Sequence, residues 1–172
     1  MKAIDKFEGE YSFLSNFHSS PVTYDGLTYP TAEHAFQAAK DWRPQVKKRM
    51  AALATPGEAK KAGRGKVDLR TKDEKWMNAK PLFVELGRGW NTERDNVMLG
   101  VVRAKFQDPE LRKMLLATGD AELTEGNTWN DKYWGVSNGA GENKLGKILM
   151  RVRGELQSDP QAVSETMPDA GH

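Results

Sequence analysis

The stretch Tyr29–Lys40 reads YPTAEHAFQAAK and places three polar side chains on one side of a predicted helix. At about 100° per residue, Glu33, Gln37 and Lys40 fall within roughly 60° of one another. The opposite arc holds small apolar residues and one Phe, which suits close packing on a core. Two interpretations of the polar arc stay open: it is a solvated helix face, or it is the floor of a site.

Two segments that mix aromatic and polar residues could form the walls of such a site. Phe13–Phe17 reads FLSNF, and Trp129–Gly135 reads WNDKYWG inside a stretch too rich in Gly and Asn for regular structure. A nucleobase held between aromatic rings gains roughly 1–3 kcal/mol from stacking, while nearby polar groups orient the sugar. A tryptophan by itself, however, is more often part of a core than of a binding platform.

The composition excludes several kinds of site. There is no cysteine, so disulfides, thiolate zinc sites and cysteine nucleophiles are excluded, and a cytoplasmic location is expected. There are three histidines, one of them the C-terminal residue, so a metal site built from several histidines is not expected. No cofactor is expected either. The nucleotide-binding patterns GxGxxG and GxxxxGK(S/T) do not occur. No apolar run approaches the roughly 18–20 residues that span a bilayer, and no signal segment is visible.

Charge is distributed unevenly along the chain. The formal net charge is +2, but residues 154–172 contain acidic residues and neither Lys nor Arg. The segment Lys40–Lys80 holds 13 of the 26 basic residues and only five acidic ones. One interpretation is an anionic partner, either a phosphate or a nucleic acid. The other is a lysine-rich solvated surface.

Turn and capping signals predict the elements that position these residues. A hairpin is expected around Asp25-Gly26, between short aromatic and β-branched runs. Thr31 is placed to cap the first helix, so Glu33 lies in its first turn, where the helix dipole favours an ionised carboxylate. A strand is predicted at 121–125. Further helices are predicted at 44–53, from Thr55-Pro56 to Gly63, at 74–87, at 92–107, from Asp108-Pro109 to Gly119, and from Asn143 onward.

These elements together predict the fold class. A chain of 172 residues is one domain of ordinary size and can bury a proper core. We predict a single compact α+β domain at residues 1–156, rich in helix and with a few short antiparallel strands. Residues 157–172 are predicted to form a disordered C-terminal tail.

Six segments follow one another in a characteristic order along the chain. They are LSNF (14–17), YPTAEHAFQAAK (29–40), KF (105–106), LLATGDAELTE (115–125), DKYWG (131–135) and NKLGKILMRVR (143–153). This ordered set resembles the NADAR family of N-glycosidases, and the resemblance extends from about Phe13 to Arg153, nearly the whole of the predicted domain. The fold of the family, a compact helix-rich α+β domain, agrees with the elements predicted above.

This resemblance implies hydrolysis of an N-glycosidic bond between a ribose C1′ and an exocyclic amine. Members of the family are associated with removing ADP-ribose from guanine, and others with cleaving reactive early intermediates of riboflavin synthesis. The implied substrate is therefore ADP-ribosylated DNA or RNA, or a small molecule that resembles ADP-ribose. An ADP-ribosyltransferase toxin is a possible partner. A module that binds ADP-ribose or NAD without turnover is a further alternative.

The resemblance also implies which residues form the site. The family's catalytic carboxylate falls on Glu33, its helix lysine on Lys40 and its loop acid on Asp131. His34 is expected to be a wall residue and not a catalyst. The residues expected to bind substrate are Ser15, Asn16, Phe17, His34, Gln37, Arg64, Trp90, Glu125, Trp134, Gly135 and Asn143.

Cleavage of a ribose C–N bond passes through a state that resembles an oxocarbenium ion, which a nearby carboxylate stabilises while an acid protonates the departing amine. Glu33 and Asp131 could divide these two roles, as paired carboxylates do in glycoside hydrolases. Lys40 could instead capture C1′ as a Schiff base, provided that burial and neighbouring cations lower its pKa. It could also simply pair with Glu33 or with a substrate phosphate. The sequence leaves these alternatives open.

Overall fold

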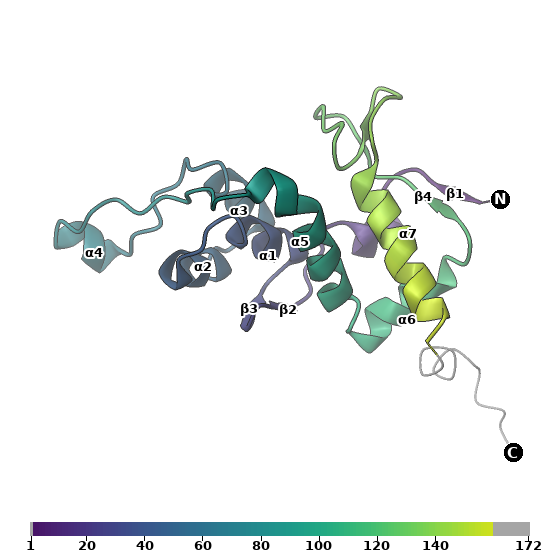
Figure 1. Cartoon of the computed structure of the whole chain (residues 1–172), viewed down its shortest axis with the longest axis horizontal. Coiled ribbons are helices and arrows are strands. Elements are labelled where there is room, and N and C mark those ends of the chain that lie inside the picture. Colours follow the sequence, from purple (N-terminus) through teal and green to yellow (C-terminus); the bar gives the residue numbers. More distant parts are fainter. Residues whose placement is uncertain (1, 160–172) are drawn as a thin grey trace, which may run out of the picture. The chain divides into compact units, whose positions relative to one another are not determined.

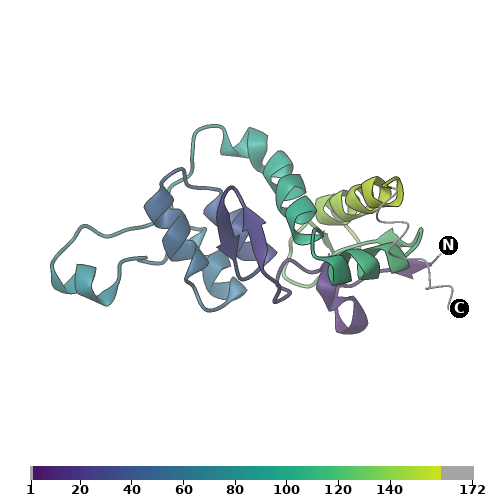
Figure 2. The same cartoon turned by 90° about the horizontal axis from the view of Figure 1, so that it is seen from below.

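The computed structural model describes residues 2–159, which form two compact units. The central unit comprises residues 16–104, and the terminal unit combines residues 2–15 with residues 105–159. Figures 1 and 2 show the elements of each unit from two sides. Most of the tail predicted at 157–172 lies outside the described residues, while Gln157 ends a helix. The predicted class, α+β and rich in helix, is confirmed.

The central unit begins with a hairpin of β2 (Val22–Tyr24) and β3 (Leu27–Tyr29). The two strands pair antiparallel, as predicted. Both turn residues, Asp25 and Gly26, have positive φ, as a tight hairpin turn requires. The helices that follow are α1 (Ala32–Ala38), α2 (Pro44–Ala51), α3 (Pro56–Ala62), α4 (Lys72–Trp76) and α5 (Trp90–Lys105), whose last residue is counted in the terminal unit.

Helix α1 lies at the centre of this unit. The Thr31 side chain accepts a hydrogen bond from the backbone N–H of His34 and so caps the helix as predicted. The helix packs against α2, α3 and both hairpin strands, and all its residues are buried, Glu33 and Gln37 included. The interpretation of the polar arc as a solvated face is therefore wrong.

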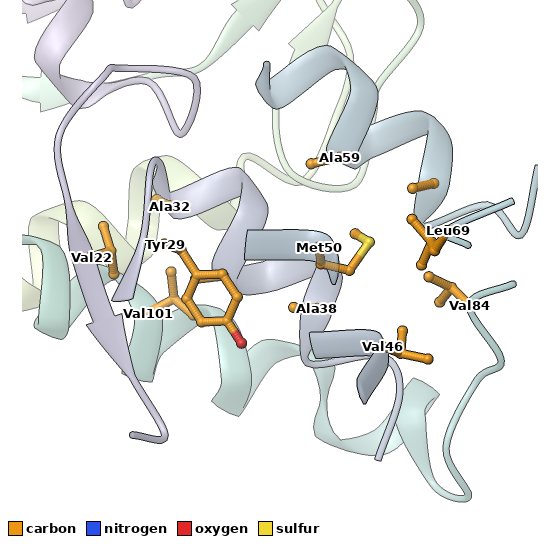
Figure 3. Packing of buried hydrophobic residues seen from close by; sticks show 12 residues of the cluster. Val22, Tyr29, Ala32, Ala38, Val46, Met50, Ala59, Leu69, Val84 and Val101 are labelled. Atoms are coloured by element: carbon orange, nitrogen blue, oxygen red, sulfur yellow. The ribbon is translucent and has the colours of Figure 1, made fainter. Parts of the chain in front are cut away.

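The core of the central unit surrounds α1 (Figure 3). Several of its members are alanines of α1 and α3, and side chains this small let the two helices pack closely. Valines and one methionine from α2, the hairpin and later segments fill the remaining space. The cluster consists of Val22, Tyr29, Ala32, Ala35, Ala38, Val46, Met50, Ala59, Ala62, Leu69, Val84 and Val101.

The helix predicted at 74–87 is wrong. Thr71 and Glu74 form a complete capping box, but the helix they start, α4, already ends at Trp76. Asn78 then adopts a positive φ, and Pro81 cannot donate a helical hydrogen bond. The chain returns from α4 in extended form to α5. We call residues 70–86 the arm.

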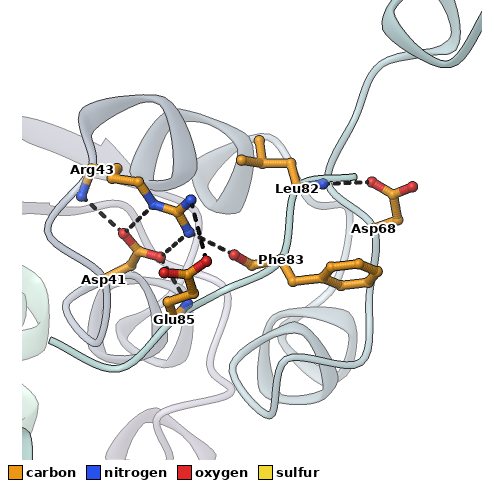
Figure 4. Close-up of polar contacts among 6 residues, drawn as sticks. All are labelled: Asp41, Arg43, Asp68, Leu82, Phe83 and Glu85. Carbon is orange, nitrogen blue, oxygen red and sulfur yellow. Dashed lines mark hydrogen bonds and ion pairs between the residues drawn. The ribbon is translucent and has the colours of Figure 1, made fainter. Parts of the chain in front are cut away.

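The return segment of the arm is fixed by two carboxylates (Figure 4). Asp41 accepts hydrogen bonds from Arg43 Nη2 at 2.7 Å and from the Glu85 backbone N–H at 2.8 Å. Asp68 accepts the backbone N–H of Leu82 at 3.2 Å. Burial acts to raise the pKa of Asp41, but its hydrogen bonds outweigh this effect and hold the pKa below the usual value. Tertiary hydrogen bonds thus replace the predicted helical ones.

The terminal unit contains β1 (Ala3–Ile4), the 3-10 helix η1 (Gly9–Leu14), α6 (Pro109–Ala117), β4 (Glu122–Leu123), β5 (Gly126–Asn127), β6 (Val136–Ser137) and α7 (Lys144–Gln157). Helix α7 packs against α6 and β4. The pairs β1–β4 and β5–β6 are parallel, so the prediction of antiparallel strands is correct for the hairpin alone. In each pair a longer segment of chain connects the two strands, since parallel strands cannot be joined by a tight turn.

Helix-end signals in the sequence are mostly confirmed. Asp108 caps α6 by accepting two backbone N–H groups, and Gly119 follows the helix with a positive φ. Thr55 caps α3, but the Glu58 carboxylate accepts the N–H of Ala54 instead of completing a capping box with Thr55. Within residues 2–159, no helix is long and apolar enough to cross a membrane.

Lys105 is a fully buried basic residue, with 1% of its surface exposed. Its Nζ donates to the Ser15 carbonyl oxygen at 2.8 Å and lies 5.3 Å from the centre of the Phe106 ring. Burial lowers the pKa of Lys105 to about 7. The charged form is therefore disfavoured in the folded state, which makes the stability of the protein depend on pH.

We predict that stability rises between pH 7 and pH 9 because of Lys105. In this range the unfolded chain still binds a proton at this side chain, whose pKa of 10.5 is restored on unfolding, while the folded chain releases it. The free energy of unfolding should gain about 2 kcal/mol over these two pH units relative to a Lys105→Met variant. Urea denaturation of both proteins at each pH measures the difference. If the free energy of unfolding changes equally with pH in the two proteins, Lys105 is not the source of the pH dependence.

Candidate functional site

The buried polar residues of α1 form a fixed pair. Gln37 Nε2 donates to Glu33 Oε1 at 2.8 Å, and the two residues are only 5% and 8% exposed. The backbone N–H of Glu33 donates to the Asn16 carbonyl at 3.0 Å. Gln37 Oε1 is buried and has no hydrogen-bond partner within the described residues. The pair therefore places the Glu33 carboxylate beside a buried amide oxygen that packs against Gly63 and makes no hydrogen bond within the described residues.

Lys40 follows α1 and is partly buried beside this pair. Its Nζ donates to the Gly63 carbonyl at a long 3.4 Å. Burial lowers the pKa of Lys40; the Glu33 carboxylate acts in the opposite direction, and Arg64 and Lys60 lower the pKa further. A larger fraction of Lys40 is therefore in the neutral amine form than in an ordinary lysine, and only the neutral amine can act as a nucleophile.

Gly63 holds α3 close to the polar pair. It is the C-terminal cap of α3, as predicted, and a Cβ atom at this position would overlap Gln37 Oε1 and Cδ. Any larger residue would have to push the Gln37 amide away from its place beside Glu33. The sequence marked Gly63 as a helix end, but its contact with Gln37 was not predicted.

Aromatic side chains flank this group within the central unit. The Trp90 ring lies 5.3 Å from the Phe36 ring of α1, and Trp90 lines a pocket of about 980 Å³ together with Lys40. Phe17 is 44% exposed, and Lys60 Nζ lies 5.9 Å from the centre of its ring. The structure therefore brings a carboxylate, a lysine and aromatic rings together around α1.

His34 is buried and uses both ring nitrogens in hydrogen bonds with the protein. Its ring is fully buried, with Nδ1 2.7 Å from Thr31 Oγ1 and Nε2 2.9 Å from the Leu53 carbonyl. The carbonyl requires a donor, so Nε2 carries the proton and Nδ1 accepts from the threonine hydroxyl. Burial lowers the pKa of His34, which favours this neutral form. Both ring nitrogens are thus used in positioning α1.

Asp131 organises the WNDKYWG loop of the terminal unit. Its Oδ1 accepts the backbone N–H groups of Tyr133 at 3.1 Å and Trp134 at 2.9 Å. Asn127 bonds both the N–H and the carbonyl of Asp131 through its side chain. One carboxylate oxygen of the predicted loop acid is therefore used in shaping the loop, which leaves Oδ2 as the atom that could face a substrate.

Asn143 joins this loop to β4. Its Oδ1 accepts the backbone N–H of Glu125 at 3.0 Å, and its Nδ2 donates to the Leu123 carbonyl at 2.9 Å. Asn143 occupies the cap position of α7, as predicted, but its side chain makes no capping bond. The Trp134 and Gly135 carbonyls instead accept N–H groups at the start of the helix. A Cβ atom on Gly135 would overlap the Glu125 carbonyl, so only glycine fits there.

The stretch Gly135–Gly139 reads GVSNG and matches the GxSxG pattern of serine hydrolases. That pattern describes a strand followed by a sharp turn into a helix, with an exposed serine. Here Ser137 is fully buried in β6, and an isolated bridge to Ala140 follows instead of a helix. Ser137 is not placed to act as a nucleophile.

The predicted site residues thus form two groups, one in each unit. Lys60 and Gly63 lie beside the first group, although neither was predicted as a site residue. Within residues 2–159, no cluster of three or more His, Asp or Glu side chains is arranged to hold a metal ion. The central group is Asn16, Phe17, Glu33, His34, Gln37, Lys40, Arg64 and Trp90, and the terminal group is Ser15, Glu125, Asp131, Trp134, Gly135 and Asn143.

Comparisons with known proteins give consistent matches. The NADAR domain family matches residues 4–157. N-glycosidase YbiA of Escherichia coli K12 is 38% identical over 149 residues, covering 86% of this chain and 82% of that protein. Riboflavin biosynthesis protein VVA0006 of Vibrio vulnificus is 37% identical over 151 residues, 86% of this chain and 36% of that protein. The NMR structure of E. coli YbiA aligns with a TM-score of 0.72 at 32% identity, covering 100% of this chain and 94% of that one.

We predict that Gly63→Ala lowers catalytic activity by about tenfold or more while the protein stays folded. The new methyl group displaces the Gln37 side chain from Glu33, and misplacement of a site group by about 1 Å can cost 100-fold in rate. Activity on the substrates proposed below and circular dichroism measure the two effects. Gly57→Ala, in the same helix but with a Cβ that would meet only Thr55 Oγ1 at 3.9 Å, is the matched control. Equal activity of Gly63→Ala and wild type would contradict the assignment.

Proposed function

The chain belongs to the NADAR domain family, and from this premise we propose that it hydrolyses the ribose C1′–N bond of ADP-ribosylated guanine in nucleic acid. At the coarser level it is a hydrolase of N-glycosidic bonds, in keeping with relatives that are named N-glycosidases. The observation that carries the proposed chemistry is the group around α1, where the buried Glu33 carboxylate acts on a lysine of lowered pKa.

Glu33 stabilises the reacting sugar in this proposal. As the C1′–N bond breaks, its electron pair moves to the amine nitrogen, and positive charge develops on C1′ and the ring oxygen. A carboxylate held by Gln37 in a buried position stabilises this charge more strongly than one in water. An acid delivers a proton to the departing amine, and water adds to C1′. We propose Asp131, in the loop of the terminal unit, as a supporting acid of the reaction.

Lys40 supports a second route to the same products. The ribose ring of an amine-linked sugar can open to an imine, to which the neutral Lys40 amine adds at C1′. The guanine amine then leaves with a proton, and a Schiff base remains on Lys40. Water hydrolyses it, which releases the sugar and restores the lysine. The lowered pKa of Lys40 favours this route over a purely electrostatic role.

The charge of the central unit supports an anionic substrate. Three arginines pair with carboxylates of the same unit, at 2.7 Å for Arg43–Asp41 and 2.6 Å for Arg49–Glu74 and Arg70–Asp68. The acidic residues of the segment Lys40–Lys80 are thereby largely neutralised, while most of its lysines are not. This excess of positive charge suits the phosphates of a nucleic acid or of ADP-ribose.

A second candidate is an N-glycosidase acting on intermediates of riboflavin synthesis. Relatives of the matched region are named riboflavin biosynthesis proteins in V. vulnificus and in Zea mays. Such substrates also join a ribose to an exocyclic amine, so the same residues would carry out their hydrolysis.

The third alternative is a module that binds ADP-ribose without turnover. Such a module has no need of a lysine with a lowered pKa. A cytoplasmic location and an ADP-ribosyltransferase toxin as the source of the substrate belong to the principal proposal.

We predict that the protein releases ADP-ribose from a guanine-ADP-ribosylated oligonucleotide, and that Glu33→Gln reduces the rate by about 100-fold or more. The substitution keeps the size of the side chain and its place beside Gln37 but removes the charge that stabilises C1′. Mass spectrometry of the released sugar follows the reaction. Ribosylamino-pyrimidine phosphates are tested in parallel. If only the pyrimidine phosphates are cleaved, the protein is an N-glycosidase of riboflavin intermediates and the proposal of ADP-ribosylated guanine as substrate is wrong.

We predict that borohydride reduction during turnover attaches the sugar covalently to Lys40. Peptide mapping should locate the adduct, and Lys40→Arg should abolish both the adduct and the activity, because arginine keeps the charge but cannot form the imine. A Lys40→Arg variant that retains most of its activity would show that Lys40 acts only through its charge. Lys61→Arg, the same change at an exposed lysine of α3, is the matched control.

A further inference from the structure

The arm exposes large apolar side chains at its end. Trp76, the last residue of α4, is 86% exposed, and Met77 after it is 65% exposed. Figures 1 and 2 show α4 at the end of a long excursion from α2 and α3 within the central unit. A neighbouring pair of exposed apolar side chains of this size marks a surface that binds a partner more often than an inert one.

Ion pairs hold the arm in place. Arg49 of α2 reaches Glu74 of α4 at 2.6 Å, and Glu74 also completes the capping box of that helix. Arg70 bonds Asp68 and donates to the Ala79 carbonyl at 2.6 Å, which ties the two sides of the arm together. Trp76 is therefore presented on a structured support, so binding there requires little ordering of the chain.

The charged groups of the arm point to the chemistry of the partner. Of its carboxylates, Glu74 pairs with Arg49 and Glu85 lies 3.8 Å from Arg43, while the exposed Asp73 makes no ion pair within residues 2–159. Lys72, Lys75 and Lys80 are exposed and make no ion pair within residues 2–159. The arm thus combines an exposed indole ring with three unpaired ammonium groups, against a single unpaired carboxylate. Stacking surfaces beside unpaired cations are what proteins use to bind single-stranded nucleic acids.

A second exposed tryptophan lies at the base of the arm. Trp42 is 59% exposed, and the Arg43 guanidinium lies 5.4 Å from the centre of its ring. Trp42 lines the same pocket of about 980 Å³ as Lys40, together with Lys47 and Arg88. Aromatic and cationic groups therefore occur both at the end of the arm and beside the proposed catalytic lysine.

We propose that the arm and Trp42 form a docking surface for the single-stranded nucleic acid that flanks the modified guanine. Trp76 and Trp42 stack on unpaired bases, while Lys72, Lys75 and Lys80 contact phosphates. A single strand is the partner because stacking needs base faces that a duplex keeps covered. This inference rests on the proposed nucleic-acid substrate and adds the surface that would hold it.

Fluorescence anisotropy of the full-length protein with an unmodified labelled DNA strand of about 20 nucleotides tests the surface. Trp76→Ala should weaken binding by about fivefold to hundredfold, and Trp76→Phe should restore part of the loss, because phenylalanine still stacks. Met114→Ala, which truncates an exposed apolar side chain of α6, should leave binding unchanged. Equal affinities of wild type and Trp76→Ala would overturn the proposal.

A salt series tests the lysines. Replacing Lys72, Lys75 and Lys80 by Gln should make the slope of log affinity against log salt about two units shallower, since each phosphate contact on a single strand contributes about 0.7. The control replaces Lys113 and Lys147, which are exposed in the terminal unit, by Gln. Equal slopes in the arm variant and in the control would exclude the lysines from the surface.

Turnover of free ADP-ribosylated guanosine separates this inference from the proposed function. Arm variants should cleave it as wild type does while losing activity on the modified strand. Cleavage of the nucleoside without binding of the strand would overturn the docking surface but would support the proposed enzyme activity. Strand binding that depends on Trp76, without cleavage of either substrate, would support the docking surface and overturn the proposed enzyme activity. Sedimentation that shows Trp76-dependent self-association and no strand binding would identify the patch as an interface between copies of the chain.

Discussion

The central unit depends on the burial of a helix that is polar on one side. Glu33 can be buried in α1 because Gln37 donates to its carboxylate and because Gly63 leaves room for the Gln37 side chain. The threonine cap and both ring nitrogens of His34 hold the start of the same helix. A buried carboxylate without such partners would cost several kcal/mol. The same contacts that make this burial tolerable also place a carboxylate and a lysine of lowered pKa together, so the packing of α1 and the proposed chemistry cannot be separated.

In the terminal unit the constraint is the hydrogen bonding of the backbone, because its loop from 126 to 142 contains little regular structure. The backbone groups there are satisfied by side chains: Asp131 and Asn127 close one turn, and Asn143 joins the loop to β4. Gly135 allows this close packing since a Cβ atom would meet the Glu125 carbonyl. Residues that the family pattern suggests for a site are therefore also the residues that keep backbone polar groups bonded. Replacing them would disturb the loop as well as the chemistry.

The basic residues of the central unit divide into two kinds. Arg43, Arg49 and Arg70 make close contacts with carboxylates, and Arg43 and Arg70 also bond backbone carbonyls. Planar guanidinium groups suit such fixed contacts, whereas lysines act as mobile point charges. The lysines of the arm remain available to an anionic partner. A count of charges in the sequence cannot make this distinction, because it depends on which carboxylates the fold brings to each arginine.

Helix caps, the hairpin turn and the family were predictable from the sequence. Thr31, Asp25-Gly26 and Asp108 act through neighbours a few residues away, so their cap and turn roles were predictable. The ordered motifs likewise indicated the family match over residues 4–157. Only the tertiary structure decided that 74–87 is not a helix, because the N–H groups of Leu82 and Glu85 bond to Asp68 and Asp41, far away in sequence. It also decided that Glu33 is buried and that the pKa of Lys40 is lowered. Burial and electrostatics depend on neighbours in space, which no local pattern records.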